Sequence, residues 1–131
     1  MRMVYSETLM EHFEQPRYAG RFDSSGDDIG TGMVGSRETG GVLRVQVRVS
    51  GRQHISEARF QAYGPPALIA AGSWLAERIQ GMALDEAAAV THQQVAQALA
   101  LPSRSLHFAL LGEDALRAAI QDYKDKQKVY A

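Results

Sequence analysis

Histidine is the residue type in this chain best suited to both metal binding and acid–base chemistry near neutral pH, because the chain has no cysteine. The four histidines are spread widely, at His12, His54, His92 and His107, and no two have the spacing of metal ligands. Zero cysteines exclude disulfides, thiolate zinc sites, cysteine nucleophiles and cysteine-ligated iron–sulfur clusters. Metal chemistry would therefore have to use oxygen and imidazole ligands.

Carboxylates and hydroxyls give weaker leads. Asp23 and the pair Asp27–Asp28 lie in a Gly- and Ser-rich segment. An oxygen-ligand cation site is one interpretation of these residues, and a turn-forming run is the favoured one. The serines at Ser73, Ser103 and Ser105 have no base in reach along the sequence, so a serine hydrolase triad has no support.

Charge and hydropathy exclude several partners. Fourteen Lys and Arg residues face fifteen Asp and Glu residues, which indicates neither a nucleic-acid nor a membrane partner. No run reaches the ~18 apolar residues of a membrane helix. The amino terminus lacks the apolar core of a signal peptide, so we expect a cytoplasmic protein.

Four arginines could form a basic surface on a hairpin. They are Arg44, Arg48, Arg52 and Arg59. A solvated sheet face is the favoured interpretation, ahead of a specific site for an acidic partner.

Strands are predicted in the first half of the chain. In residues 42–49 every odd position is apolar, and Arg44, Gln46 and Arg48 alternate with them, which is typical of a strand with one buried and one wet face. Residues 55–63 follow after a turn at 50–53, so the two strands should pair as an antiparallel hairpin. The segment 17–41 is interpreted mostly as loop, with a short strand near 29–35.

Helices are predicted at the amino terminus, up to Pro16, and throughout the chain after Gly64. The later helices are expected at about 65–80, 84–90 and 91–99, with a last helix from about 105 into the charged tail. Strands followed by helices indicate an α+β fold, a small antiparallel sheet of about three strands with helices packed on one face. We expect one domain over residues 1–131.

Several stretches of the chain occur in the order and spacing of a known family. They are residues 5–7 with 12–17, the Gly-Thr-Gly-Met-Val-Gly loop at 30–35, the strand at 57–64, and the final helix at 112–120 with 122–124. Together, from about residue 4 to about residue 126, they resemble the IscU/NifU N-terminal type of iron–sulfur cluster assembly scaffold. The resemblance implies the scaffold's α+β sandwich. It also implies a protein that receives iron and sulfide, holds a nascent 2Fe–2S cluster and passes it on.

The resemblance implies a ligand set of three cysteines, an aspartate and a histidine. The matching positions in this chain are Thr39, Gly41, Pro65 and the pair His107-Phe108, so only the histidine is kept. Iron in such clusters is held mainly by thiolates, and the neutral hydroxyl of Thr39 cannot replace one. We therefore expect no 2Fe–2S cluster and no other cofactor, with Phe108 buried against the Pro65 loop.

The resemblance also implies candidate partner contacts. Tyr5, Val34 and Gly35 match the scaffold surface that meets the cysteine desulfurase, which makes that enzyme the expected partner. Leu101 and Pro102 are what remains of the family's Leu-Pro-Pro-Val-Lys chaperone motif. The second proline, the valine and the lysine of that motif are changed, so the resemblance gives little support for binding an Hsp70-type chaperone.

Two classes of function stay open. The first is a non-catalytic adaptor or regulator that engages assembly partners without holding a cluster. The second is a metal- or small-ligand-binding protein that reuses the former cluster pocket, with His107, Glu38 and Thr39 as contacts. No motif favours an enzyme.

Overall fold

A three-stranded antiparallel sheet forms the centre of the structure, a computed structural model that describes residues 5–23 and 25–129. The strands are β1 (Ile29–Ser36), β2 (Gly41–Val49) and β3 (Ile55–Tyr63), with β2 between the other two. The predicted hairpin of the second and third strands is confirmed, and the short strand expected near 29–35 is a full edge strand paired with β2.

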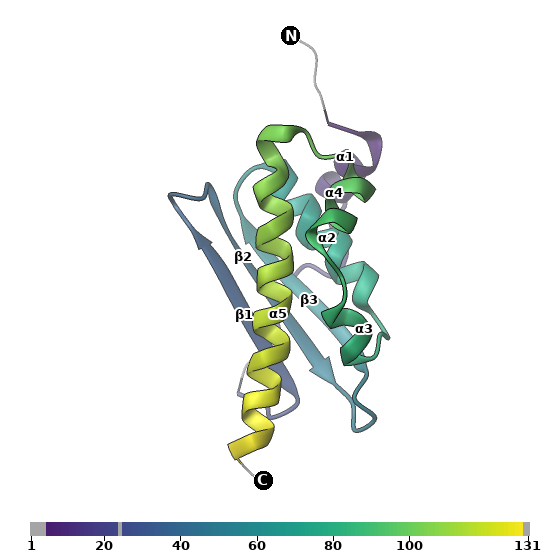
Figure 1. Cartoon of the computed structure of the whole chain (residues 1–131), viewed down its shortest axis with the longest axis vertical. Coiled ribbons are helices and arrows are strands. Elements are labelled where there is room, and N and C mark those ends of the chain that lie inside the picture. Colours follow the sequence, from purple (N-terminus) through teal and green to yellow (C-terminus); the bar gives the residue numbers. More distant parts are fainter. Residues whose placement is uncertain (1–4, 24, 130–131) are drawn as a thin grey trace.

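Helices cover one face of this sheet (Figure 1). They are α1 (Glu7–Glu14), α2 (Pro66–Ile79), α3 (Leu84–Ala88), α4 (His92–Leu99) and α5 (Leu106–Val129), with a 3-10 turn at Ser103–Ser105. α5 runs along β1 and β2, whereas α2 lies over β3. The predicted α+β fold is therefore confirmed. None of the described helices is long and apolar enough to cross a membrane.

The helix ends follow from local sequence signals. Pro66 takes the first position of α2, where its missing N–H costs nothing. Gly81, just beyond the end of α2, has a φ of 78°, which glycine adopts without strain. At the start of α4, Thr91 accepts a hydrogen bond from the backbone N–H of Gln94, and the Gln94 side chain accepts one from Thr91, as the capping box predicts.

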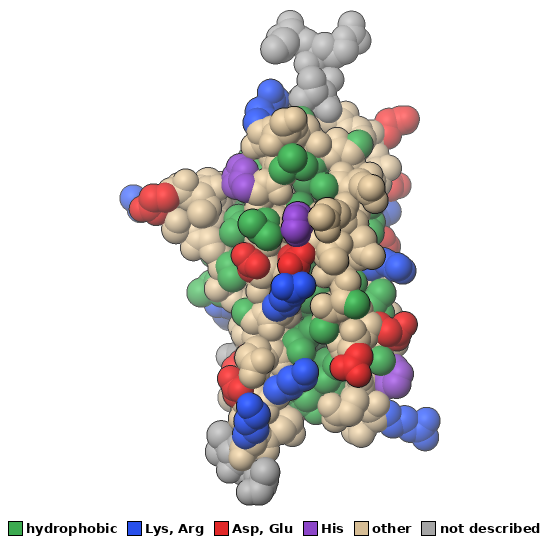
Figure 2. Space-filling model, in the orientation of Figure 1, with side chains coloured by type: hydrophobic (Ala, Val, Ile, Leu, Met, Phe, Trp, Pro, Cys, Tyr) green, Lys and Arg blue, Asp and Glu red, His purple; other side chains and the backbone are tan. Residues whose placement is uncertain are grey.

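The helix-bearing face carries side chains of both charges. Figure 2 shows them interspersed, with hydrophobic side chains visible between them. Leu106 and Leu110, one turn apart on α5, are 46% and 44% exposed. This face is therefore mixed in charge, with a small apolar area near the start of α5.

The other face of the sheet is half covered, which corrects the expectation that it would be uniformly wet. Gln46 is only 1% exposed, because the chain before β1 crosses this face. The Gln46 side-chain oxygen Oε1 accepts the Phe22 backbone N–H at 2.7 Å, and its side-chain nitrogen Nε2 donates to the Thr31 hydroxyl at 2.9 Å. The alternating pattern of β2 could not reveal this, because the covering segment lies outside the strands.

The outer edge of β3 is closed by residues from elsewhere in the chain. Ile55 exchanges backbone hydrogen bonds with residues 81 and 82, and Phe60 does so with residues 18 and 20. Between them, the Gln80 side chain accepts from the backbone N–H of Ala58 and donates to its carbonyl. The sequence indicated a loop over most of 17–41. Within that segment, residues 18–20 extend the sheet beside β3.

Two glycines let α5 lie directly on β1. A Cβ at Gly30 would lie 2.1 Å from the Ala119 carbonyl oxygen, and one at Gly32 would lie 2.1 Å from that of Ala115. Real Cβ atoms do not approach backbone oxygens so closely, so only glycine fits. The Gly-x-Gly spacing in β1 therefore sets the distance between the sheet and α5.

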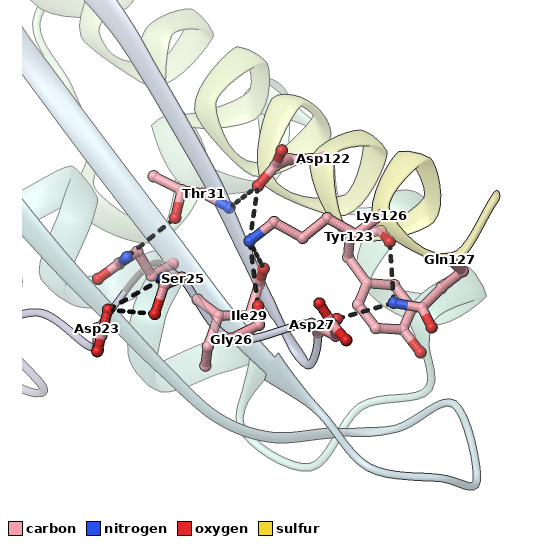
Figure 3. A network of polar contacts seen from close by, with 11 residues as sticks. Asp23, Ser25, Gly26, Asp27, Ile29, Thr31, Asp122, Tyr123, Lys126 and Gln127 are labelled. Carbon is pink, nitrogen blue, oxygen red and sulfur yellow. Dashed lines mark hydrogen bonds and ion pairs between the residues drawn. The ribbon is translucent and has the colours of Figure 1, made fainter. Parts of the chain in front are cut away.

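The far end of α5 is fixed to the start of β1 by polar contacts (Figure 3). The Lys126 ammonium donates to the carbonyl oxygens of Gly26 and Ile29, at 3.1 and 2.8 Å. Asp122, one turn earlier, accepts the Thr31 backbone N–H at 2.9 Å. These contacts explain the acidic run at 23–28. Asp23 accepts hydrogen bonds from the backbone N–H and the hydroxyl of Ser25, and Lys126 holds the turn through its bond to the Gly26 carbonyl. The turn interpretation is confirmed.

A buried carboxylate joins α4 to α5. Glu113 is 7% exposed, and one of its oxygens accepts both the backbone N–H and the ring Nδ1 of His92, at 2.6 and 2.9 Å. Its other oxygen lies 3.1 Å from the Arg117 guanidinium. Burial by itself would raise the pKa of Glu113, but the two hydrogen bonds from His92 and the charge of Arg117 together lower it.

We expect Glu113→Gln to lower the free energy of unfolding by about 1–3 kcal/mol, because the amide loses the charge-assisted bonds to His92 and Arg117. A carboxyl with a depressed folded-state pKa stabilises the fold above its unfolded pKa of about 4.3 and loses that contribution as the pH falls through the lower folded value. Urea unfolding between pH 3 and pH 7 should therefore show a wild-type loss below about pH 4.3 that is smaller in the variant. Equal acid sensitivity of the two proteins would mean that Glu113 does not cause the loss of stability at low pH.

Candidate functional site

Three connections meet at one end of the sheet: the β1–β2 hairpin, the β3–α2 link and the start of α5 (Figure 1). A Cβ at Gly64 would lie 3.1 Å from the Gly40 carbonyl oxygen, so the first two connections touch. A Cβ at Gly40 would lie 3.7 Å from the Phe108 ring, so α5 touches the same hairpin. The structure thus brings the sequence-predicted ligand positions into one small region.

Thr39 is held inside the hairpin. Its hydroxyl oxygen accepts the Ser36 backbone N–H at 2.8 Å and lies within donating distance of the carbonyl oxygens of Ser36 and Gly41, at 2.9 and 3.1 Å. A hydroxyl has one proton and two lone pairs, so these contacts use most of its capacity. The Thr39 side chain therefore shapes the loop and is a poor anchor for an added ligand.

His107 also bonds to this hairpin. Its Nε2 lies 3.1 Å from the Thr39 carbonyl oxygen, and a carbonyl can only accept, so Nε2 carries the proton. In the neutral ring Nδ1 is then the one nitrogen with a lone pair for a metal or a proton. The side chain is exposed, and its ring lies 4.0 Å from that of Phe108, centroid to centroid.

Phe108 fills the space beneath the hairpin. It is 6% exposed and belongs to the hydrophobic core, with its ring next to Gly40. A buried apolar ring thus lies among the positions that the resemblance matched to cluster ligands. Pro65 precedes α2 in an extended conformation, with a φ of −71°, and offers no side-chain donor.

Gly41 has no room for a side chain. A Cβ there would lie 2.5 Å from the Leu68 side chain, which is fully buried, and 2.8 Å from the Tyr63 carbonyl oxygen. An aspartate at this position would clash with the Tyr63 backbone and with the buried Leu68 side chain. The hairpin is therefore packed directly on the start of α2, as a closed joint.

The described residues offer little for a metal ion. Glu38 is exposed at the hairpin tip, where its own backbone N–H and the Ser36 hydroxyl lower its pKa. Within residues 5–23 and 25–129, no three His, Asp or Glu side chains gather closely enough to hold a metal. The donor set around His107, a single imidazole nitrogen with hydroxyl and carbonyl oxygens, does not fit an iron–sulfur cluster.

The positions that the resemblance matched to partner contacts lie around this end of the molecule. Val34 is half-buried against the core, and Gly35, with a φ of 105°, is the penultimate residue of β1 beside the hairpin. Leu101 packs partly against the core in the link between α4 and α5, followed by a half-buried Pro102. Tyr5 packs partly against the core before α1. These placements leave the partner roles open.

Ser73 does have a base in reach, contrary to the sequence-based expectation. Its hydroxyl lies 2.7 Å from His12 Nδ1 and accepts the Arg17 backbone N–H at 2.9 Å, while Glu77 lies 3.8 Å from His12 Nε2. Burial, followed by the charge of Arg17, lowers the His12 pKa. Ser73 is fully buried, so the arrangement joins α1 to α2 and gives no access to a substrate. Sequence reasoning missed the contact because the pair is 61 residues apart.

Comparison with known proteins gives one consistent result. Residues 4–130 match the NifU-like N terminal domain family. The chain is 41% identical to the iron–sulfur cluster assembly scaffold protein IscU of Escherichia coli K12, over 96% of this chain and 98% of that protein. It is 42% identical to the protein of the same name from Haemophilus influenzae, over 95% of this chain and 99% of that one. A NifU-like N-terminal structure from Brucella abortus superposes with a TM-score of 0.68 at 16% identity, covering 92% of this chain and 94% of that one.

Proposed function

Because the chain belongs to the family of NifU-like N-terminal domains, which includes the IscU-type assembly scaffolds, we propose that it acts in iron–sulfur cluster assembly without holding a cluster. In this role it is an adaptor or regulator that engages a scaffold partner, foremost the cysteine desulfurase. Membership of this family supports a role in iron–sulfur cluster assembly. The altered ligand end of the sheet supports the loss of the holding step.

One observation carries the proposal: the ligand end is rebuilt as packing. Phe108 is buried beneath Gly40, and Gly41 is closed against Leu68. Apolar side chains and backbone packed together in this way offer iron no thiolate or imidazole ligand. Phe108 belongs to the hydrophobic core, which favours a role carried by the surface of the domain.

The alternative, a metal- or small-ligand-binding protein built around His107, has less support. The Nε2 of His107 is used by the Thr39 carbonyl, and the Thr39 hydroxyl is used within the hairpin. A lone exposed imidazole nitrogen binds divalent metals weakly and with little selectivity.

We expect the chain to bind a cysteine desulfurase from its own host and to compete with a cysteine-bearing scaffold for it. Arg37 is exposed at the tip of the β1–β2 hairpin, two residues after the expected contact Gly35, so we place it at the edge of this interface. Arg37→Glu should then weaken the binding about tenfold, as reversal of a contact charge does. Arg52→Glu is the matched control, because Arg52 is exposed in the turn at the opposite end of β2. Isothermal titration calorimetry with the purified desulfurase measures both variants.

Two results would count against the proposal. Failure of the wild-type chain to bind the desulfurase would remove the adaptor role and leave the ligand-binding alternative. Equal weakening by Arg37→Glu and Arg52→Glu would mean that the effect is a general one of net charge, and the hairpin end would not be the contact.

A further inference from the structure

Met33 offers an oxidisable sulfur on the surface of a chain that has no cysteine. Its neighbour Gly32 faces α5, so the alternation of the strand turns Met33 to the other face of the sheet, where 59% of it is exposed. Met10 and Met82, in contrast, pack partly against the core. Oxidants convert an accessible methionine thioether to the sulfoxide, and among the described methionines Met33 is the most accessible.

A guanidinium group lies beside the Met33 sulfur. Arg44 is the cross-strand neighbour of Met33 on β2, and its Nη2 donates toward the Met33 Sδ at 3.9 Å. Its Nη1 donates to the Gln61 side-chain oxygen on β3 at 3.3 Å, which orients the group across the sheet. A thioether sulfur is a weak acceptor, and this contact occupies one of its two lone pairs. An oxidant therefore has open access to the other lone pair.

The same guanidinium suits the oxidised product. A sulfoxide is polar, and its oxygen is a better acceptor than the thioether sulfur. In the described part of the chain no carboxylate oxygen lies within 4.0 Å of the Arg44 guanidinium, so the group is not held in an ion pair. Arginine has five N–H donors, and the contacts to Gln61 and Met33 leave most of them available. Arg44 can therefore bind a sulfoxide oxygen on Met33 and keep its bond to Gln61.

We propose that Met33 is a site of reversible oxidation by hydrogen peroxide, at which Arg44 selects one sulfoxide epimer and binds its oxygen. The sulfur lone pair attacks one peroxide oxygen and the O–O bond breaks. The proton on the transferred oxygen then joins the departing hydroxide as water. Sulfur loses two electrons and the peroxide gains them. A methionine sulfoxide reductase, with a thiol as reductant, reverses the step.

Oxidation at this position spares the fold. A sulfoxide in a core would bury a polar group, whereas the Met33 side chain lies mostly in solvent. The site uses none of the former ligand positions and no partner protein. It therefore does not rest on the adaptor role, and the failure of either proposal would leave the other standing.

The test treats the full chain with hydrogen peroxide and follows each methionine by tryptic mapping and mass spectrometry. Sulfoxide should form several-fold faster at Met33 than at Met10 or Met82. The two classes of methionine sulfoxide reductase each act on one epimer, so digestion of the Met33 peptide with either class, with dithiothreitol as reductant, gives the epimer ratio. We expect about a fivefold excess of one epimer, the factor that one weak hydrogen bond provides.

Arg44→Ala should bring the two epimers of Met33 close to equal amounts, because both lone pairs are then open. Arg52→Ala is the matched control, since Arg52 is exposed in the β2–β3 turn, and it should keep the excess. The thermal midpoint of the wild-type chain should stay unchanged when Met33 is converted and Met10 and Met82 are still reduced.

Four results would overturn the proposal. The first is oxidation of Met10 or Met82 as fast as that of Met33. The second is an equal epimer ratio in the wild-type chain, and the third is an excess that survives Arg44→Ala. The fourth is a lower thermal midpoint after oxidation of Met33, which would mean that its sulfur belongs to the packed structure.

Discussion

The variant Thr39→Cys/Pro65→Cys/Phe108→Cys should assemble a coloured iron–sulfur species where the wild-type chain assembles none. The structure places these three positions around Gly40 and Gly64 at one end of the sheet, close to His107. Three thiolates with one imidazole form a donor set of the kind that holds iron–sulfur clusters, whereas hydroxyl, proline and phenyl groups do not. Incubation with ferrous iron, sulfide and thiol, followed by visible absorption, should show charge-transfer bands in the variant alone.

The single variant Phe108→Cys is the internal control. Replacing a buried ring by a small side chain should cost about 3 kcal/mol of stability through the cavity it leaves, without supplying a ligand set. Adding Gly41→Asp to the triple variant should lower stability further, because Gly41 faces the Leu68 side chain and the Tyr63 carbonyl. A coloured species at stoichiometric iron in the wild-type chain would mean that its ligand end can hold a cluster without cysteine.

Gly32→Ala should be among the most damaging single methyl additions in this protein. The new Cβ would lie 2.1 Å from the Ala115 carbonyl oxygen and 2.5 Å from the Ala119 backbone nitrogen, so α5 must move off β1. Such overpacking costs about 3 kcal/mol. In a chain of this size that corresponds to a drop of about 10 °C in the thermal midpoint. Calorimetry or circular dichroism on heating measures it.

Gly51→Ala is the matched control for this effect. Gly51 lies in the β2–β3 turn with nothing within 4 Å of a Cβ, and it has no positive φ. The same chemical change there should alter stability by less than about 0.5 kcal/mol. Equal midpoints for Gly32→Ala and the wild-type chain would mean that α5 does not lie as close to β1 as described.

Much of the fold could be predicted because local patterns and packing agree. The apolar odd positions of residues 43–49 predicted a strand with one buried face. Leu43, Val45 and Val47 do lie in the core. The capping box at Thr91 and the glycine after α2 marked helix ends by their local hydrogen bonds. These signals act within a few residues, so the sequence carries them directly.

Features missed by sequence reasoning depend on contacts between distant residues. Gln46 reads as a wet strand residue until Phe22 is placed across it. The Ser73–His12 pair and the Glu113–His92 pair join elements that only the folded chain brings together. The ligand end was located by family resemblance, since Thr39 and His107 carry no local pattern that would place them side by side.

The closed outer edge of β3 limits how copies of this protein can polymerise. Residues 55–60 of that edge are already occupied by the chain's own backbone and by the Gln80 side chain. β1 forms the opposite edge of the sheet. Fibrils that grow by adding strand to strand need two free edges on every unit, so sheet extension through β1 would end once two copies had met.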